Sequence, residues 1–124
     1  MALHTSGEDY LEAVLVLKQQ LGMVRSVDVA RHLNVTKASV TNATRLLREG
    51  GFLRKDYEGF WMLTPLGREV AEKTYEKHCF FRKLLTDAGV DPKLAERDAC
   101  RMEHGISEES FEKLKIRAGR TAAE

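Results

Sequence analysis

Residues 26–51 read SVDVARHLNVTKASVTNATRLLREGG, and this stretch decides the fold. We expect Ser26 to cap a short helix over residues 27–32, and Thr36 to cap a second helix that continues to about Glu49, where two glycines end it. Only a tight turn separates the two helices. Short helices joined by a turn of this length are typical of a helix-turn-helix.

Two apolar, partly aromatic runs follow this stretch, at residues 52–55 and 60–63, and a short connection containing glycine separates them. This arrangement predicts a β-hairpin, and a hairpin directly after a helix-turn-helix is a wing. An amphipathic helix that starts at residue 5 or 6 and ends by Gly22 precedes both elements. Residues 1–64 are therefore predicted to form a winged helix-turn-helix DNA-binding domain.

Helical signals dominate the rest of the chain. Proline is tolerated at a first helical position, so Pro65 is expected to begin a long helix and Pro92 a second one, while Ser107 caps a third. Residues 65–124 are predicted to form an all-helical domain, and the fold class is mainly α. A chain of 124 residues buries only a small core, so we expect a partner subunit to complete it.

The second helix of the helix-turn-helix is expected to enter the major groove with its first two turns. Its apolar positions are Val40, Ala43, Leu46 and Leu47, which are expected to face inward. The positions left outside are then Lys37, Ala38, Ser39, Thr41, Asn42 and Arg45. Taken alone, such a set is also what an ordinary solvated helix face contains; its order after a helix-turn-helix and before a wing is what favours DNA reading.

Individual roles follow from side-chain chemistry. Asn42 suits an adenine edge, and Ala38 suits a thymine methyl group. Arg45 suits a phosphate, as Arg48 does one turn later. Two further cations, Arg54 and Lys55, lead into the wing, where they are expected to meet the adjacent DNA backbone or the minor groove.

Side chains that ligate metals gather in three predicted helical segments. Cys100, Glu103 and His104 stand at positions i, i+3 and i+4, which share one face of a helix. Asp9 and Glu12 have the i, i+3 spacing, and the long helix carries His78. Each group also has a purely structural explanation: Cys100 as a buried thiol, His78 as a core histidine, and the two carboxylates of the first helix as residues that favour a helix start. Together, donors of mixed hardness indicate one composite site for a divalent transition metal.

The bulk composition excludes several classes of protein. Hydrophobic residues make up 43% and charged residues 31% of the chain, and no apolar run reaches the roughly 18 residues of a membrane span. The N-terminus does not resemble a secretory signal, and two cysteines fit a reducing compartment. We therefore expect a cytoplasmic protein without a membrane partner. The net charge of +1 does not by itself argue for or against nucleic acid.

The order of a winged helix, a long helix and then Cys100-x-x-Glu103-His104 resembles the metal-dependent repressors of the diphtheria toxin repressor and manganese transport regulator family. Residues 6–12, SGEDYLE, are similar to the first-helix motif of the manganese branch, and residues 98–104, DACRMEH, to the iron branch. Both branches keep a ligand histidine at the position of His78. The resemblance implies the metal ligands Asp9, Glu12, His78, Cys100, Glu103 and His104.

The chain is nevertheless a hybrid of the two branches. The manganese branch has a glutamate where Cys100 stands, whereas the iron branch has a methionine at the position of Asp9 and no carboxylate at that of Glu12. The iron branch also builds a second site with a carboxylate where this chain has Arg82. We therefore do not expect that second site here.

The resemblance implies a homodimeric repressor that binds double-stranded operator DNA when loaded with Mn(II) or Fe(II), and that controls metal homeostasis genes. Residues 65–124 would be its metal-binding and dimerisation domain, and no small-molecule substrate is expected. One alternative is a winged-helix regulator that senses no metal. Another is a small metallohydrolase in which Glu103 serves a bound water, but six ligands leave little open coordination and no glycine-rich phosphate cradle is visible. We therefore expect no enzyme.

Overall fold

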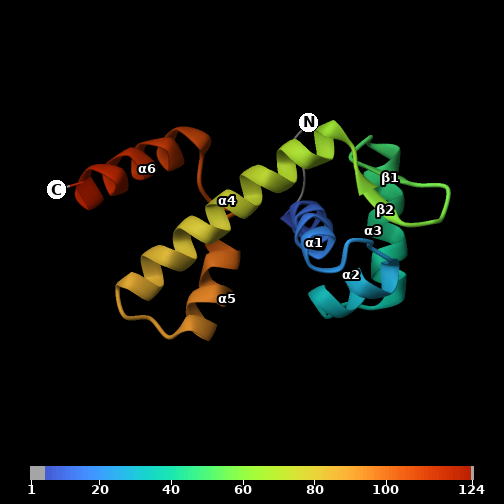
Figure 1. Cartoon of the computed structure of the whole chain (residues 1–124), viewed down its shortest axis with the longest axis horizontal. Helices are drawn as coiled ribbons and strands as arrows, with labels where there is room; N and C mark the ends of the chain where they lie inside the picture. Colours follow the sequence, from blue (N-terminus) through green and yellow to red (C-terminus); the bar gives the residue numbers. More distant parts are fainter. Residues whose placement is uncertain (1–4, 124) are drawn as a thin grey trace. The chain divides into compact units, whose positions relative to one another are not determined.

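The computed structural model describes residues 5–123, with the side chains of residues 6–119. It divides into two compact units, Met1–Tyr75 and Glu76–Glu124. The first contains α1 (Thr5–Leu21), α2 (Ser26–Leu33), α3 (Lys37–Glu49), β1 (Leu53–Lys55), β2 (Trp61–Leu63) and the first turns of α4 (Pro65–Asp87) (Figure 1). The second contains the rest of α4, α5 (Pro92–Met102) and α6 (Glu108–Ala123). The predicted fold class, mainly α with a winged helix-turn-helix, is confirmed.

The helix-turn-helix forms for local reasons that are visible in its caps. The Thr36 hydroxyl accepts a hydrogen bond from the backbone N–H of Ser39 at 3.1 Å, so Thr36 caps α3 as predicted. Asn34 adopts a left-handed conformation with φ of 55°, a conformation that asparagine tolerates better than most residues, and it ends α2. The turn between the two helices is therefore fixed by the residues that the sequence places there.

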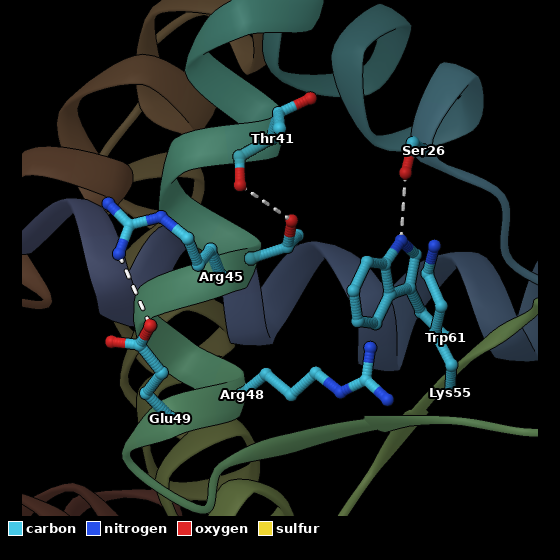
Figure 2. A pocket seen from close by; sticks show the side chains of 8 residues that line it. Ser26, Thr41, Arg45, Arg48, Glu49, Lys55 and Trp61 are labelled. Atoms are coloured by element: carbon cyan, nitrogen blue, oxygen red, sulfur yellow. Dashed lines mark hydrogen bonds and ion pairs between the residues drawn. The ribbon is translucent and has the colours of Figure 1, made fainter.

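The predicted cap of α2 is wrong. Ser26 is the first residue of α2, and Arg25 precedes it as the cap, because the Asp28 carboxylate accepts the backbone N–H of Arg25 at 2.9 Å. The Ser26 hydroxyl instead accepts the indole N–H of Trp61 at 2.9 Å, which joins α2 to the hairpin (Figure 2). Asp28 is buried and its pKa is lowered, first by the hydrogen bond from the Arg25 backbone.

The wing is a two-stranded antiparallel hairpin in which Leu53 pairs with Leu63 and Lys55 with Trp61. Its turn is held by the Asp56 carboxylate, which accepts backbone N–H groups two and four residues further on, both at 2.9 Å. The backbone N–H of Trp61 also donates to the Val24 carbonyl at 2.8 Å. The hairpin is therefore anchored to the segment that leads into α2.

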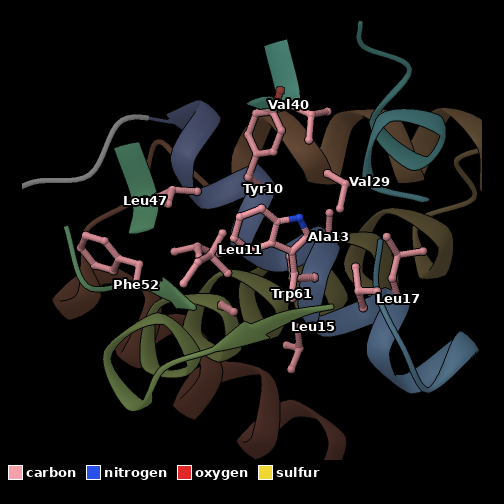
Figure 3. Packing of buried hydrophobic residues seen from close by; sticks show 14 residues of the cluster. Tyr10, Leu11, Ala13, Leu15, Leu17, Val29, Val40, Leu47, Phe52 and Trp61 are labelled. Carbon is pink, nitrogen blue, oxygen red and sulfur yellow. The ribbon is translucent and has the colours of Figure 1, made fainter. Parts of the chain in front are cut away.

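The core of the first unit forms around α1 (Figure 3). Leu11 and Val14 on this helix are at most 2% exposed, and Val40 and Leu47 of α3 pack into the same cluster with Trp61 of the hairpin. Burying a side chain of this size contributes about 1.5–3 kcal/mol. The face of α3 that packs inward thereby determines which face remains outside.

The start of α4 belongs to the core of the first unit, because Ala71 is fully buried in that core and Val70 packs against it. The division between the units therefore falls inside α4, and the domain boundary between residues 64 and 65 stays a prediction. The second unit has its own apolar cluster around Phe81, Ala99 and Phe111.

The second unit departs from the sequence prediction at the end of α5. This helix ends at Met102, so Glu103 is its C-cap and His104 lies in the turn that follows. Glu103 still has helical backbone angles, with φ of −61° and ψ of −22°. The motif Cys100-x-x-Glu103-His104 therefore straddles a helix end: Glu103 keeps its helical spacing from Cys100, whereas His104 lies in the turn that follows.

Candidate metal centre and nucleic-acid interface

The exposed face of α3 contains the side chains that the sequence predicts for it. Exposed positions are Lys37, Ala38, Ser39, Thr41, Asn42 and Arg45. Leu46 was expected inside but is 53% exposed, whereas Thr44 is buried and bonds the Val40 carbonyl at 2.7 Å. The reason is periodicity, because position 44 lies one turn after Val40 while position 46 falls on the flank of the helix.

Two of the predicted reading residues bind each other. The Arg45 guanidinium donates to the Asn42 side-chain oxygen at 2.8 Å and pairs with Glu49 at 3.3 Å. Asparagine needs both its amide oxygen and its amide nitrogen for a bidentate contact with adenine. Arg45 must therefore turn away from Asn42 before this contact forms, and a phosphate is a suitable new partner for it.

A cleft of about 440 Å³ lies between α3, the start of α2 and the wing (Figure 2). Arg48 extends toward Trp61 and Lys55 in this cleft, and the Lys55 ammonium stands 4.7 Å from the centre of the Trp61 ring. Within the described part of the chain, neither Arg48 nor Lys55 pairs with a carboxylate. Two cations on one cleft repel each other, so the arrangement suits an anion such as a DNA phosphate.

Base reading and phosphate binding predict different mutational signatures. Asn42→Ala is expected to relax base preference at one position of the bound DNA, at a cost of about 1–3 kcal/mol. Arg54→Ala, on the exposed side of β1, is expected to weaken binding to all sequences alike and to reduce the salt slope by about one unit. Binding titrations on a panel of single-base variants at several salt concentrations measure both. If Asn42→Ala weakened binding to all sequences alike and Arg54→Ala relaxed base preference, α3 would not be the reading helix.

The first pair of candidate metal ligands lies on α1. Asp9 and Glu12 are both half-buried. Asp9 also lines a cleft of about 380 Å³ together with Ser39 and Asn42 of α3. A movement of the Asp9 side chain can therefore affect α3, the helix that is expected to read DNA.

The second group of candidate ligands gathers around one buried carboxylate. The Glu103 side chain is 0% exposed, and its oxygens lie 3.2 Å from Nδ1 of His78 and 3.3 Å from Nε2 of His104. Two donor atoms that each lie about 2.1 Å from one ion, at right angles, are about 3 Å apart. Within the second unit, ligand atoms of His78, Cys100 and Glu103 lie within 4.8 Å of one another, as do those of Glu103 and His104, and this spacing fits a divalent transition metal.

The surroundings of His78 favour the protonated form of its ring. Its pKa is raised to about 9, first by the hydrogen bond with Glu103 and further by Glu96, while burial acts in the opposite direction. The cationic ring offsets the charge of the buried Glu103 carboxylate. Ligation at His78 therefore requires the release of this proton, since a metal binds the neutral imidazole.

Cys100 differs from the other candidates of the second unit because its side chain is exposed, while Cys79 is half-buried. Neither cysteine forms a disulfide in the described part of the chain. A thiolate at Cys100 remains a candidate soft ligand.

Sequence reasoning missed Glu96. Its carboxylate lies 2.7 Å from Nε2 of His78, and its other oxygen lies 3.4 Å from the Arg82 guanidinium. These contacts join α4 to α5 across 18 and 14 residues of sequence, so no helical spacing signals them. Only the three-dimensional packing of the two helices reveals that Glu96 is a neighbour of a candidate ligand.

Comparison with known proteins identifies similarity over nearly the whole chain. Residues 2–59 match the family model described as the N-terminal DNA-binding domain of the iron-dependent repressor. Residues 64–122 match the model described as the metal-binding and dimerisation domain of the same repressor. The two matches follow the order of the two units described above.

Individual relatives agree with these matches. An uncharacterised helix-turn-helix transcriptional regulator of Methanocaldococcus jannaschii is 36% identical over 112 residues, which cover 88% of this chain and 89% of the relative. The transcriptional regulator MntR of Salmonella typhimurium is 34% identical over 106 residues, covering 85% of this chain and 67% of the relative. The crystal structure of IdeR from T. acidophilum superposes with a TM-score of 0.76 at 30% identity, over 96% of this chain but only 55% of that one. This chain thus spans about half the length of the solved IdeR chain.

Proposed function

The chain belongs to the iron-dependent repressor family, which includes the diphtheria toxin repressor and the manganese transport regulator, and from this premise we propose that it is a repressor activated by Mn(II) or Fe(II). In this proposal it binds operator DNA as a homodimer and controls genes of metal homeostasis. Members of the family are transcriptional regulators, not enzymes. No helix in the described part of the chain is long and apolar enough to cross a membrane.

One observation supports metal activation most strongly: the fully buried Glu103 carboxylate stands between the imidazoles of His78 and His104. Burying a carboxylate costs several kcal/mol unless a cation or hydrogen bonds compensate it. The compensating groups in the structure are the His78 ring at 3.2 Å, whose pKa is raised, and the His104 ring at 3.3 Å. A divalent ion supplies more positive charge to the same group.

We propose that six side chains of the sequence supply the metal ligands. They are Asp9, Glu12, His78, Cys100, Glu103 and His104. A bound divalent ion supplies the charge that offsets these carboxylates. The oxygen donors suit Mn(II), while a thiolate suits Fe(II), so the mixed set is consistent with activation by both.

The link between ligands and DNA runs through α1. Asp9 lines the same cleft as Ser39 and Asn42, and α1 packs against α3 in one core. Fixing the Asp9 and Glu12 carboxylates therefore restrains the face of α1 that supports the reading helix. Fixed reading helices are what a dimer needs in order to meet two half-sites on one face of a duplex.

Dimer formation is proposed for the second unit, which contains the family's dimerisation domain. Four large apolar side chains of this unit are 41–53% exposed in the single chain: Leu84, Leu94, Leu114 and Ile116. Large apolar side chains that are exposed in a single chain favour burial against a partner. A second copy of the chain is the partner that the family relationship supports.

The decisive experiment measures metal-dependent DNA binding by the full chain. Duplexes are first selected from a random pool in the presence of Mn(II), and the chelated protein is then titrated with Mn(II), Fe(II), Co(II) or Zn(II) under anaerobic, reducing conditions. We expect Mn(II) and Fe(II) each to raise affinity at least about tenfold, which corresponds to about 1.4 kcal/mol of coupling free energy. Equal affinity with metal and with chelator would instead identify a winged-helix regulator that senses no metal.

A further inference from the structure

The His78 ring lies between two carboxylates, one at each nitrogen. Nδ1 faces Glu103 at 3.2 Å, and Nε2 faces Glu96 at 2.7 Å. Each nitrogen therefore faces its own carboxylate, and the contact between Nε2 and Glu96 is a hydrogen bond.

The two carboxylates have different surroundings. Glu103 is 0% exposed and is shared with the imidazole of His104, whereas Glu96 is 52% exposed and lies at the outer edge of the group. Arg82 stands 3.4 Å from the second oxygen of Glu96. Glu103 thus lies beside a further candidate ligand, His104, whereas Glu96 pairs with the guanidinium of Arg82.

We propose that Glu96, held by Arg82, is a positioning residue for the metal ligand His78. Glu96 accepts the Nε2–H proton of His78, which leaves Nδ1, on the side of Glu103, as the atom that ligates. A ligating histidine that donates its other N–H to a carboxylate is fixed in tautomer and orientation, and its basicity rises. This inference rests on the proposed function, because it assumes that His78 and Glu103 bind metal.

Arg82 argues against Glu96 as a ligand in its own right. A permanent positive charge at one carboxylate oxygen disfavours a second cation beside it. Arg82 also contacts the Cys79 sulfur at 3.9 Å, so the guanidinium has a second partner on its own helix. Arg82 therefore holds the Glu96 carboxylate in place, and Glu96 in turn orients the His78 ring.

Mn(II) binding to the chelated full-length protein tests this assignment, with free Mn(II) measured by electron paramagnetic resonance. Loss of such a carboxylate weakens metal affinity about 10- to 100-fold, and this is the effect expected for Glu96→Ala. Glu96→Gln should lower Mn(II) affinity less, because the amide oxygen of glutamine still accepts a hydrogen bond from Nε2–H of His78. Glu76→Ala is the matched control, and this variant should bind Mn(II) like the parent. Glu76 is 53% exposed and pairs with Lys115 at 2.6 Å, and its position lies about 200° around α4 from that of His78.

The His78→Ala background separates positioning from other effects. If Glu96 acts through the ring, Glu96→Ala should change Mn(II) affinity less than about twofold once His78 is absent. A loss of full size in that background would overturn the proposal, because it would identify a ligand or a general charge effect. Circular dichroism checks that each variant is folded.

Failure of the inference and failure of the proposed function give different results. Parent affinity in Glu96→Ala, together with lost affinity in Glu103→Ala, would overturn only the positioning role. A parent protein that binds no Mn(II), or a Glu103→Ala variant that binds it as the parent does, would overturn both.

Discussion

Glu103→Ala is expected to abolish the gain in DNA affinity that Mn(II) or Fe(II) produces. The variant removes the oxygens that lie 3.2 Å from His78 and 3.3 Å from His104. The metal site then lacks one ligand, and both imidazoles lack the carboxylate that they share. Removing one partner of a buried charged pair typically costs about 3–5 kcal/mol in the state that contains the pair. Metal affinity should therefore fall by more than about a hundredfold, and the operator titration should become flat.

The measurement compares DNA binding with saturating Mn(II) and with chelator for each variant. Glu109→Ala is the control, because Glu109 is an exposed glutamate of α6 outside the candidate site. It should respond to metal like the parent. A Glu103→Ala protein that is folded, dimeric and still fully metal-responsive would refute the composite site.

The order of elements follows from local signals in the sequence. The Thr36 cap, the turn at Asn34 and the proline at the start of α4 each act within a few residues, so each is predictable from its neighbours. Ser26 shows the limit of this reasoning. Its hydroxyl suits a cap, but at the start of α2 the Asp28 carboxylate accepts the backbone N–H of Arg25 instead. The Ser26 hydroxyl accepts a hydrogen bond from the indole of Trp61, 35 residues away.

The candidate site was predictable where ligand types recur at short spacing. Cys100, Glu103 and His104 were found as a motif, although the helix that was expected to hold them ends at Met102. Glu96 was not predictable, because a single glutamate on an exposed helix face is ordinary in sequence. Its contact with His78 depends on how α4 and α5 pack, and no local pattern encodes that packing.

A second large effect is expected from Gly67→Ala, which concerns stability. A Cβ atom at this position would lie 1.9 Å from the Phe52 carbonyl oxygen and 2.9 Å from its carbon. Backbone atoms cannot rotate away as a side chain does. The first turn of α4 would have to move off the segment before β1, although Thr64 binds that segment at 3.2 Å through its N–H and at 2.6 Å through its hydroxyl.

We expect Gly67→Ala to lower the free energy of unfolding by about 3 kcal/mol, the upper end for overpacking. Thermal unfolding at fixed protein concentration measures this loss, and the fluorescence of Trp61, the only tryptophan, reports on the unit that contains Gly67. Gly119→Ala is the control. No atom lies within 4 Å of a Cβ at Gly119, and alanine favours a helix over glycine by up to about 1 kcal/mol, so this variant should be as stable as the parent or more so. Equal melting of Gly67→Ala and parent would show that α4 does not need this close approach. The expected loss would instead show that the helix that carries His78 needs a glycine in its first turn, where it meets the backbone of Phe52.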